Sequence, residues 1–375
     1  MDSDGPTAPA LDEQHCDFNY GYRMNCDCGE ISSISAADYH IKSTIDALMP
    51  CEHCDGTIHF GPRVAALRNP DDPVLDNTRI NRVAWYHTST HLDWPSATYA
   101  NDQRAKLLAT AHYLPAGHSD SFIEQQLNQA LHVGTYESAI ENMLRRMCDQ
   151  DDGAAQFYLH RVTLAVDPDC VNDGYRDENH ESAAQLTTSD LRQSGLVAIR
   201  YMNVYESVGS LSLAVLPETI TYVQTISLPV TTLAPTHNDS LHSLLEQFQG
   251  SLEGLRTNAP ETSAIAAVRL RLKQLIEPDL EEIHAMSAAH GSSYYELWNS
   301  LIAALTEQYL PHISPVVRED FDSAMSAWHR EQAKQSAGRF ADFFAASAVA
   351  LTRPRAVMAL AATQEPRAMT GAMSA

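Results

Sequence analysis

The sequence lacks the apolar segments that a membrane protein requires. It has no run of about eighteen apolar residues, and its first residues, MDSDGPTAPALDEQHC, contain neither a basic nor an apolar segment. A membrane-spanning helix needs about 20 such residues, and a secretory leader needs both kinds of segment. We therefore expect a cytoplasmic protein with no membrane partner.

Positive charge is also scarce. The 375 residues include 25 Lys and Arg against 48 Asp and Glu, which gives a net charge of -23 at pH 7. Nonspecific nucleic-acid binding needs clustered Lys and Arg, so the composition argues against it, although a local pair such as Arg145 and Arg146 remains. The length favours two or three modules over one core.

Cysteine is infrequent but clustered. The chain has seven cysteines, an odd number, and four of them form two close pairs, Cys26 with Cys28 and Cys51 with Cys54. Clustered cysteines in a large chain indicate metal ligation in a reducing compartment rather than disulfides. Four thiolates suit tetrahedral zinc, so we expect a structural zinc site. The short first pair leaves Cys16 or His53 as possible replacement ligands, and ordinary reduced cysteines are the alternative.

The hydrophobic pattern predicts an α+β protein. It indicates a small N-terminal zinc module, a central domain with a mixed, mostly antiparallel sheet, and a C-terminal all-helical domain. The Thr- and Pro-rich segment after Pro229 separates the last two. The expected ranges are a disordered tail 1–15, a zinc-ribbon-like module 16–62, a linker 63–82, the α+β domain 83–228, a linker 229–238, a helical domain 239–350 and a loosely ordered tail 351–375.

Three short motifs carry the polar residues of the central domain. His87 and Thr88 lie at the end of a predicted strand, and Thr135 lies at the N-cap position of a predicted helix over 136–147. A strand that ends in Gly-Thr at a helix start can bind an anion, because free backbone amides point outward there. The third motif is a predicted hairpin over 197–223 that contains Glu206. Its simplest interpretation is a turn with incidental polar residues.

Together these motifs resemble the ADP-ribosyltransferase-like domains, particularly divergent ones of phage and mobile-element polyvalent proteins. The resemblance covers roughly residues 83–228. The matching segments are Tyr86-His87-Thr88-Ser89, a strand that leads into a helix, and Tyr201-Met-Asn203-Val-Tyr-Glu206-Ser-Val-Gly209-Ser210-Leu-Ser212. The first segment lacks the Gly of the family motif. His132-Val-Gly134-Thr135 can be aligned in its place, so two registrations remain open.

The resemblance implies an enzyme that uses NAD. Glu206 would stabilise the positive charge that develops on the ribose when the bond to nicotinamide breaks, and His87 would share the catalytic site. The residues implied to bind NAD, directly or by supporting the site, are Thr88, His132, Gly134, Thr135, Asn203 and Ser212. The products would be ADP-ribosylated protein or nucleic acid, or free ADP-ribose if the enzyme is an NAD glycohydrolase.

Two other functions fit the same residues. One is a noncatalytic zinc-containing protein whose helical domain binds a protein partner, because a fold does not by itself establish an activity. The other is a nuclease or phosphotransferase in which His87 and His132 act as general acid and base.

Overall fold

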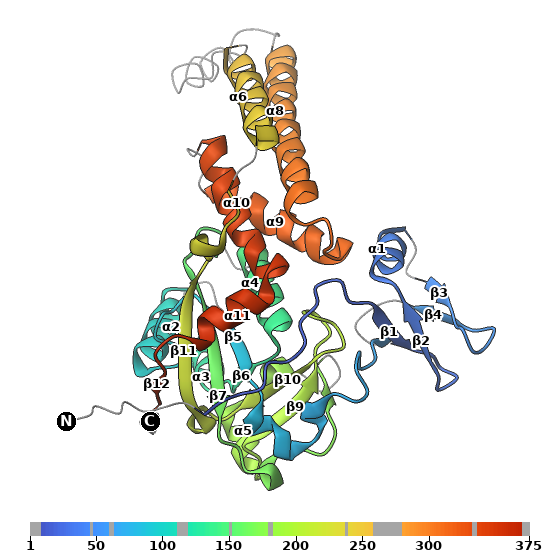
Figure 1. The fold of residues 1–375 in the computed structure, drawn as a ribbon, viewed down its shortest axis with the longest axis vertical. Coiled ribbons are helices and arrows are strands. Elements are labelled where there is room, and N and C mark those ends of the chain that lie inside the picture. Colours follow the sequence, from blue (N-terminus) through green and yellow to red (C-terminus); the bar gives the residue numbers. More distant parts are fainter. Residues whose placement is uncertain are drawn as a thin grey trace.

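The structure is a computed structural model that describes residues 9–45, 48–59, 64–110, 119–149, 152–178, 183–236, 239–257, 280–331 and 336–369. The predicted class is confirmed: the protein is a mixed α+β structure with antiparallel sheets, several helices and a cysteine cluster near the N-terminus. In Figure 1 a body of two sheets carries a long helical hairpin at one end and the cysteine-containing module at one side.

The cysteine-containing module consists of two small hairpins and one helix. Strands β1 (Tyr22–Asn25) and β2 (Ile31–Ile34) pair antiparallel, as do β3 (Leu48–Pro50) and β4 (Thr57–His59). Helix α1 (Ala36–Ile45) connects the hairpins, and the Ser35 hydroxyl accepts a hydrogen bond of 3.1 Å from the Asp38 amide. Ser35 therefore caps this helix, because its oxygen satisfies an otherwise unpaired donor.

Two four-stranded sheets form the central body. One has the order β12-β11-β7-β5 and the other β6-β10-β9-β8. Neighbours are antiparallel except β8 and β9. A pair of 2.9 Å backbone hydrogen bonds between Tyr86 and Gly134 joins the edges of the two sheets. The strands are β5 (Trp85–Ser89), β6 (Leu131–Val133), β7 (Phe157–Leu164), β8 (Arg176–Asp177), β9 (Ala198–Met202), β10 (Leu211–Val215), β11 (Ile220–Leu228) and β12 (Arg367–Ala368).

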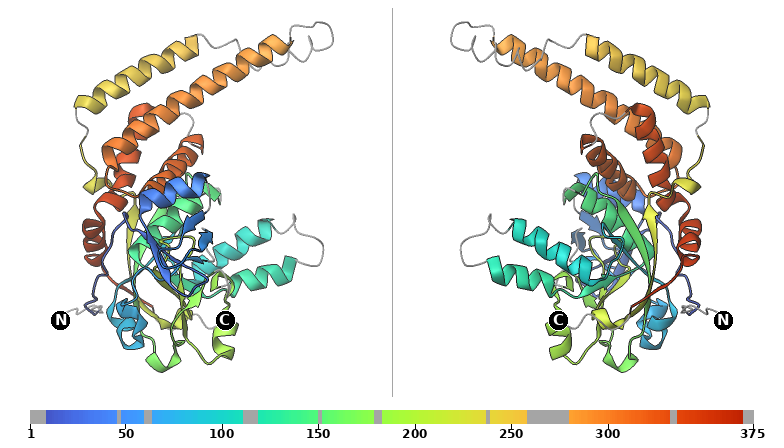
Figure 2. Two further views of the ribbon diagram at one scale, coloured as in Figure 1. Left: turned by 90° about the vertical axis from the view of Figure 1, so that its right-hand side faces the viewer. Right: turned by 90° about the vertical axis from the view of Figure 1, so that its left-hand side faces the viewer.

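Helix α4 (Tyr136–Asp149) links the sheets to the helical domain. Its apolar residues recur at helical spacing and are buried: Ala139, Ile140, Met143, Leu144 and Met147. It packs against β5 and against α9. Helices α2 (Ala97–Thr110) and α3 (Ser119–Leu127) form a second, shorter hairpin that extends from the body in Figure 2. Helix α5 (Thr188–Gln193) begins with a capping box formed by Thr187 and Asp190.

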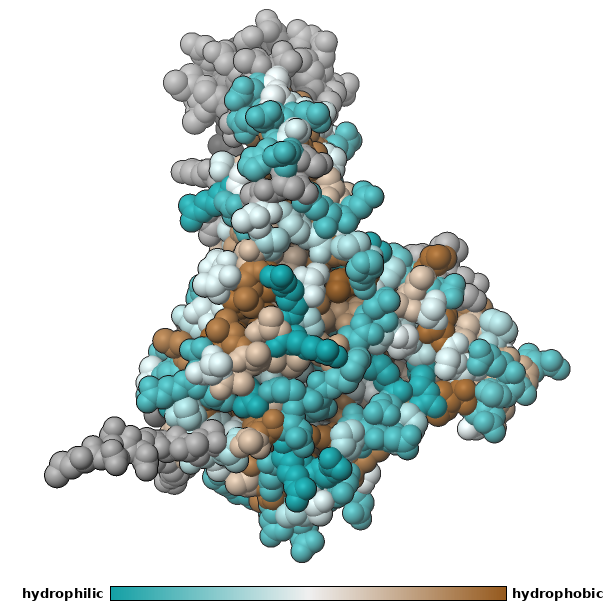
Figure 3. Space-filling view, viewed as in Figure 1, coloured by the Kyte–Doolittle hydropathy of each residue, from teal (hydrophilic) through white to brown (hydrophobic). Residues whose placement is uncertain are grey.

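The C-terminal part is helical. Its helices are α6 (Asp239–Thr257), α8 (Leu280–Tyr309), α9 (Pro315–Glu331), α10 (Ala337–Thr352) and α11 (Pro354–Ala362). Leu241, Phe248 and Leu252 of α6 are buried in a core shared with α4 and the cysteine-containing module. The face in Figure 3 is largely hydrophilic, with small apolar patches near the base of the hairpin. Residues 258–279 of the predicted helical domain lie outside the described part of the chain.

Within the described residues, no single helix has the length and apolar composition to cross a membrane. Helices α10 and α11 meet the criterion only as a pair, and they are bent by 86° with respect to one another.

The predicted N-terminal tail and first linker are more ordered than expected. The Ala84 amide donates to the Asp12 carbonyl, and Glu13 accepts hydrogen bonds from the Tyr86 hydroxyl at 2.5 Å and from Arg161 at 2.8 Å. Residues 9–15 are held because Glu13 pairs with the buried guanidinium of Arg161; residues 1–8 lie outside the described part. The linker 63–82 contains two 3-10 helices, Pro73–Leu75 and Asn77–Arg82, which bury Val74 and Ile80.

The C-terminal segment after residue 351 is not the loosely ordered tail that we expected. Helix α11 buries Val357, Met358 and Ala361, and β12 adds a strand to β11. The C-terminal segment is ordered because it covers the edge of the sheet. Backbone groups of β11 that would otherwise be unpaired form hydrogen bonds with residues 367–368. Residues 370–375 lie outside the described part of the chain.

Candidate metal centre and candidate active site

The four paired cysteines converge on one point. The Sγ atoms of Cys26, Cys28, Cys51 and Cys54 all lie within 4.8 Å of one another. The Sγ atoms of Cys26 and Cys54 are 3.8 Å apart, as are those of Cys28 and Cys51. A tetrahedron with metal–sulfur bonds of about 2.3 Å has sulfur–sulfur edges of about 3.8 Å. The cluster is therefore positioned to bind a metal ion, as predicted.

Backbone amides donate hydrogen bonds to two of these sulfur atoms. The His53 amide donates to Cys51 Sγ at 3.3 Å, and the Gly56 amide donates to Cys54 Sγ at the same distance. The hydrogen bond from His53 is the largest cause that lowers the pKa of Cys51 to about 6. The His53 ring instead contacts the Ile31 carbonyl, and neither it nor Cys16 belongs to the cluster.

The three motifs of the central domain meet at one small cavity of about 90 Å³. It lies between β5, β6, the start of α4 and the loop that joins β9 to β10. Seven of the eight predicted site residues line it: His87, Thr88, His132, Gly134, Asn203, Glu206 and Ser212. Thr135 instead lines a larger cavity of about 490 Å³, together with Gly209 and Ser210.

Glu206 is buried in the loop between β9 and β10, with 7% of its surface exposed. Its Oε1 accepts hydrogen bonds from Arg145 Nε at 2.6 Å and from Asn142 Nδ2 at 3.0 Å. Both partners lie on α4. The carboxylate is therefore fixed in position by two side chains of one helix, one of them charged.

The two histidines differ in their partners. His87 Nδ1 lies 2.9 Å from the His132 carbonyl oxygen, and its ring stacks on Trp94 with centroids 4.0 Å apart. His132 Nδ1 lies 2.9 Å from the Tyr201 hydroxyl, and its buried Nε2 has no partner among the described residues. Burial lowers the pKa of His87 well below the ordinary value and that of His132 to about 4. Both rings are therefore neutral at neutral pH.

The remaining predicted residues shape the walls. Thr88 donates its hydroxyl to the Ala139 carbonyl at 2.7 Å, and Thr135 caps α4 by accepting from the Ser138 amide at 3.2 Å. A Cβ on Gly134 would lie 2.3 Å from two serine hydroxyls, so a larger residue here would force both serine side chains to move. Asn203 donates to the Ser210 and Ser212 hydroxyls at 2.7 and 2.9 Å, which braces the loop that carries Glu206.

Sequence reasoning missed three residues around Glu206. Asn142 and Arg145 are on the polar side of an amphipathic helix, and no sequence signal links them to a hairpin about 60 residues away. Glu178 accepts a hydrogen bond from the Val204 amide at 2.9 Å. Burial, and to a smaller extent the charge of Glu206, raises the pKa of Glu178 to about 7.

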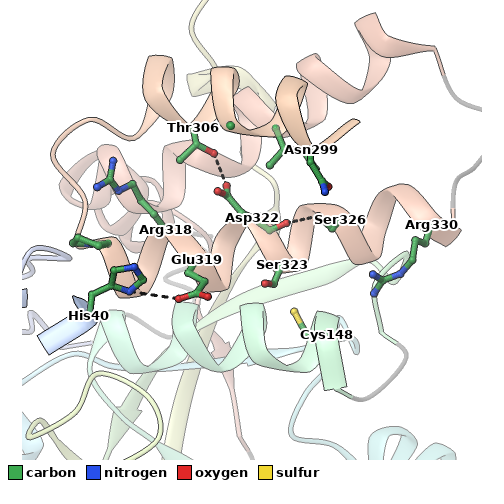
Figure 4. A pocket seen from close by; sticks show the side chains of 13 residues that line it. His40, Cys148, Asn299, Thr306, Arg318, Glu319, Asp322, Ser323, Ser326 and Arg330 are labelled. Carbon is green, nitrogen blue, oxygen red and sulfur yellow. Dashed lines mark hydrogen bonds and ion pairs between the residues drawn. The ribbon is translucent and has the colours of Figure 1, made fainter. Parts of the chain in front are cut away.

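A cavity of about 790 Å³, larger than the one beside Glu206, lies elsewhere, between α1, α4, α8 and α9 (Figure 4). Most of its lining residues carry polar or charged side chains. Thr306 donates a hydrogen bond to Asp322, and His40 Nδ1 lies 3.5 Å from Glu319 Oε2. None of the predicted site residues lines this cavity. The cavity therefore gives no support to the prediction that the three motifs form a binding site.

Comparison with known proteins does not extend these observations: no protein-family model, curated protein sequence or solved structure matches the chain. The function is therefore inferred from the geometry of the cysteine cluster and of the cavity beside Glu206.

Proposed function

We propose that the cavity beside Glu206 binds the nicotinamide–ribose part of NAD and that the protein cleaves the bond between the two groups. The observation that carries the proposal is that His87, His132 and Glu206, from three separate segments, line one cavity. The order of elements also agrees with the resemblance, since β5 carries the first motif, β6 leads into α4, and Glu206 precedes β10.

The proposed reaction uses charge stabilisation. When the glycosidic bond breaks, its electron pair goes to the pyridinium nitrogen, nicotinamide leaves as a neutral molecule, and positive charge develops on the ribose. The fixed carboxylate of Glu206 stabilises that charge, as carboxylates do in glycoside hydrolysis. An acceptor oxygen or nitrogen then bonds to the ribose carbon and loses its proton. With water as acceptor, the products are ADP-ribose, nicotinamide and a proton.

The neutral histidines suit a sugar better than a phosphate. If His87 donates from Nδ1 to the His132 carbonyl, its Nε2 is left as an acceptor for a ribose hydroxyl. The buried Nε2 of His132 has no partner within the described part of the chain, and a ligand hydroxyl would satisfy it. A histidine with a pKa of about 4 is uncharged at neutral pH, has no second proton to give and is a poor general acid. This weighs against the nuclease or phosphotransferase alternative.

Two features oppose binding in the observed conformation. The cavity of about 90 Å³ is small compared with ligand pockets of roughly 300–1,000 Å³, so NAD binding requires its walls to open. Arg145 also competes for the Glu206 carboxylate. Since 42% of the Arg145 side chain is exposed, we propose that it moves toward solvent when the substrate binds.

We also propose that the cysteine cluster holds zinc in a structural role. Four thiolates complete a tetrahedral shell, which leaves no open position for a water or a substrate. The metal therefore takes no part in the proposed reaction.

The proposal is tested by nicotinamide release from NAD, with Glu206→Gln as the variant. Glutamine keeps an oxygen acceptor for Asn142 and Arg145 but carries no charge, so the fold is expected to persist while turnover is lost. Glu218→Gln is the matched control, because Glu218 is exposed, pairs with Arg192 and does not line the cavity. Equal turnover in wild type and Glu206→Gln contradicts the assignment of Glu206. No turnover by the wild type favours the noncatalytic interpretation.

A further inference from the structure

A continuous set of contacts connects the cysteine-containing module to the loop that carries Glu206. The first step is at β1, which ends immediately before Cys26. The Ala66 amide donates to the Arg23 carbonyl at 2.8 Å, and Arg23 donates back to the Leu67 carbonyl at 2.8 Å. Asn25 Nδ2 donates to the Ala65 carbonyl at 3.0 Å. Residues 65–67 therefore lie along β1 and follow its position.

The second step joins this segment to the turn after Glu206. The Arg68 amide donates to the Gly209 carbonyl at 2.8 Å, and Arg68 Nη2 donates to the Ser207 hydroxyl at 3.0 Å. The two segments are in close contact. A Cβ built on Gly209 would lie 2.7 Å from the Ala66 carbonyl oxygen, and the φ of Gly209 is +79°.

The turn itself has a conformation that needs outside support. Ser207 is fully buried and has a φ of +47°, in the left-handed region that is unfavourable for a residue other than glycine. Its amide donates to Glu141 Oε2 at 2.6 Å, and Glu141 also accepts from the Tyr20 hydroxyl at 2.9 Å. Tyr20 precedes β1, and the Arg68 guanidinium lies 4.1 Å from the centroid of its ring.

We infer that metal binding by the cysteine-containing module positions Glu206, with Arg68 as the main positioning residue. The ion holds the turn after β1, β1 holds residues 65–67, and Arg68 holds Ser207 and Gly209 on either side of the turn. Removal of the ion frees β1 and lets Ser207 leave its left-handed conformation, which displaces the adjacent Glu206. This regulatory role rests on the proposed function of Glu206, but the coupling itself is a structural property.

Amide hydrogen exchange of residues 203–210 tests the coupling without any need for NAD turnover. We expect exchange in this segment to be about tenfold faster after Zn²⁺ is removed by a chelator, while β7 residues 157–164 are unchanged. Equal exchange with and without Zn²⁺ overturns the inference. Faster exchange in both segments also overturns it, because a general loss of structure is then the cause.

The Arg68→Gln variant tests the contacts between the cysteine-containing module and the Glu206 loop separately from metal binding. We expect this variant to retain one Zn²⁺ per chain and yet to show the fast exchange in 203–210 that the wild type shows only without metal. Arg79→Gln is the control, since Arg79 is exposed, lines the same cavity as Arg68 and has no hydrogen bond to the loop in this structure. Slow exchange in Arg68→Gln overturns the role of Arg68.

Turnover provides a second readout if NAD is cleaved. We expect Arg68→Gln to lower kcat about tenfold and to change KM less than about twofold, since Arg68 acts through Ser207. Arg68→Lys, which keeps the charge beside Tyr20, is expected to recover part of kcat. A change confined to KM contradicts a positioning role. If the wild type does not cleave NAD, the proposed function is refuted. The exchange experiment then still tests the coupling between the metal site and the loop on its own.

Discussion

Replacement of Glu141 by glutamine is expected to change how the stability of the protein depends on pH. Glu141 is buried between Tyr20 and Ser207, and burial raises its pKa from 4.5 to about 8. A carboxyl group with a raised pKa binds its proton more tightly in the folded protein than in the unfolded chain. The contribution of Glu141 to the unfolding free energy is therefore largest below pH 4.5 and decreases steadily up to pH 8.

The magnitude follows from the two pKa values. Between pH 5 and pH 8 the wild type loses about 3 to 4 kcal/mol of unfolding free energy through this group, because each pKa unit corresponds to about 1.4 kcal/mol. Glutamine does not titrate and still accepts the hydrogen bonds of Tyr20 and Ser207. Glu141→Gln is therefore expected to lose less stability than the wild type as the pH rises.

Denaturant titrations of both proteins at several pH values between 5 and 8 measure this difference. The exposed Glu218→Gln serves as the control and is expected to follow the wild type. Parallel pH dependences for wild type and Glu141→Gln would show that Glu141 is ionised in the fold near its ordinary pKa and would refute the reasoning.

Three further results are expected. Cys26→Ser removes one of four thiolates and is expected to lower zinc affinity by at least about tenfold, as measured by competition with a chelator. Gly134→Ala places a methyl group against two serine hydroxyls and is expected to lower the unfolding free energy by about 1–3 kcal/mol, measured by denaturant titration; unchanged stability would refute the close contact. Arg145→Gln removes the cation beside Glu206 and is expected to raise the rate of NAD cleavage, whereas a lower rate would show that Arg145 assists the reaction.

Two features could be predicted because they depend only on residues that are close together in the sequence. Four cysteines in two close pairs have few uses other than a metal site, and their clustering was confirmed. The helix over 136–149 was also predictable, because its apolar residues recur at helical spacing after the capping Thr135. Both signals lie within short segments and do not depend on how distant strands pair.

The sequence could not predict contacts that depend on the packing of distant segments. Asn142 and Arg145 contact Glu206 only because α4 packs beside the loop between β9 and β10. Residues 9–15 are ordered because Glu13 pairs with Arg161. Residues 354–369 are ordered because the edge of β11 is free to pair with β12. In each case the stabilising partner lies more than a hundred residues away or on another element.

The central claim, that the cavity beside Glu206 cleaves NAD, is tested most directly by nicotinamide release from NAD by the zinc-loaded wild type and Glu206→Gln. The account predicts release by the wild type and a loss of at least about a hundredfold in the folded variant. Equal release by both proteins, or none by the wild type, would contradict it.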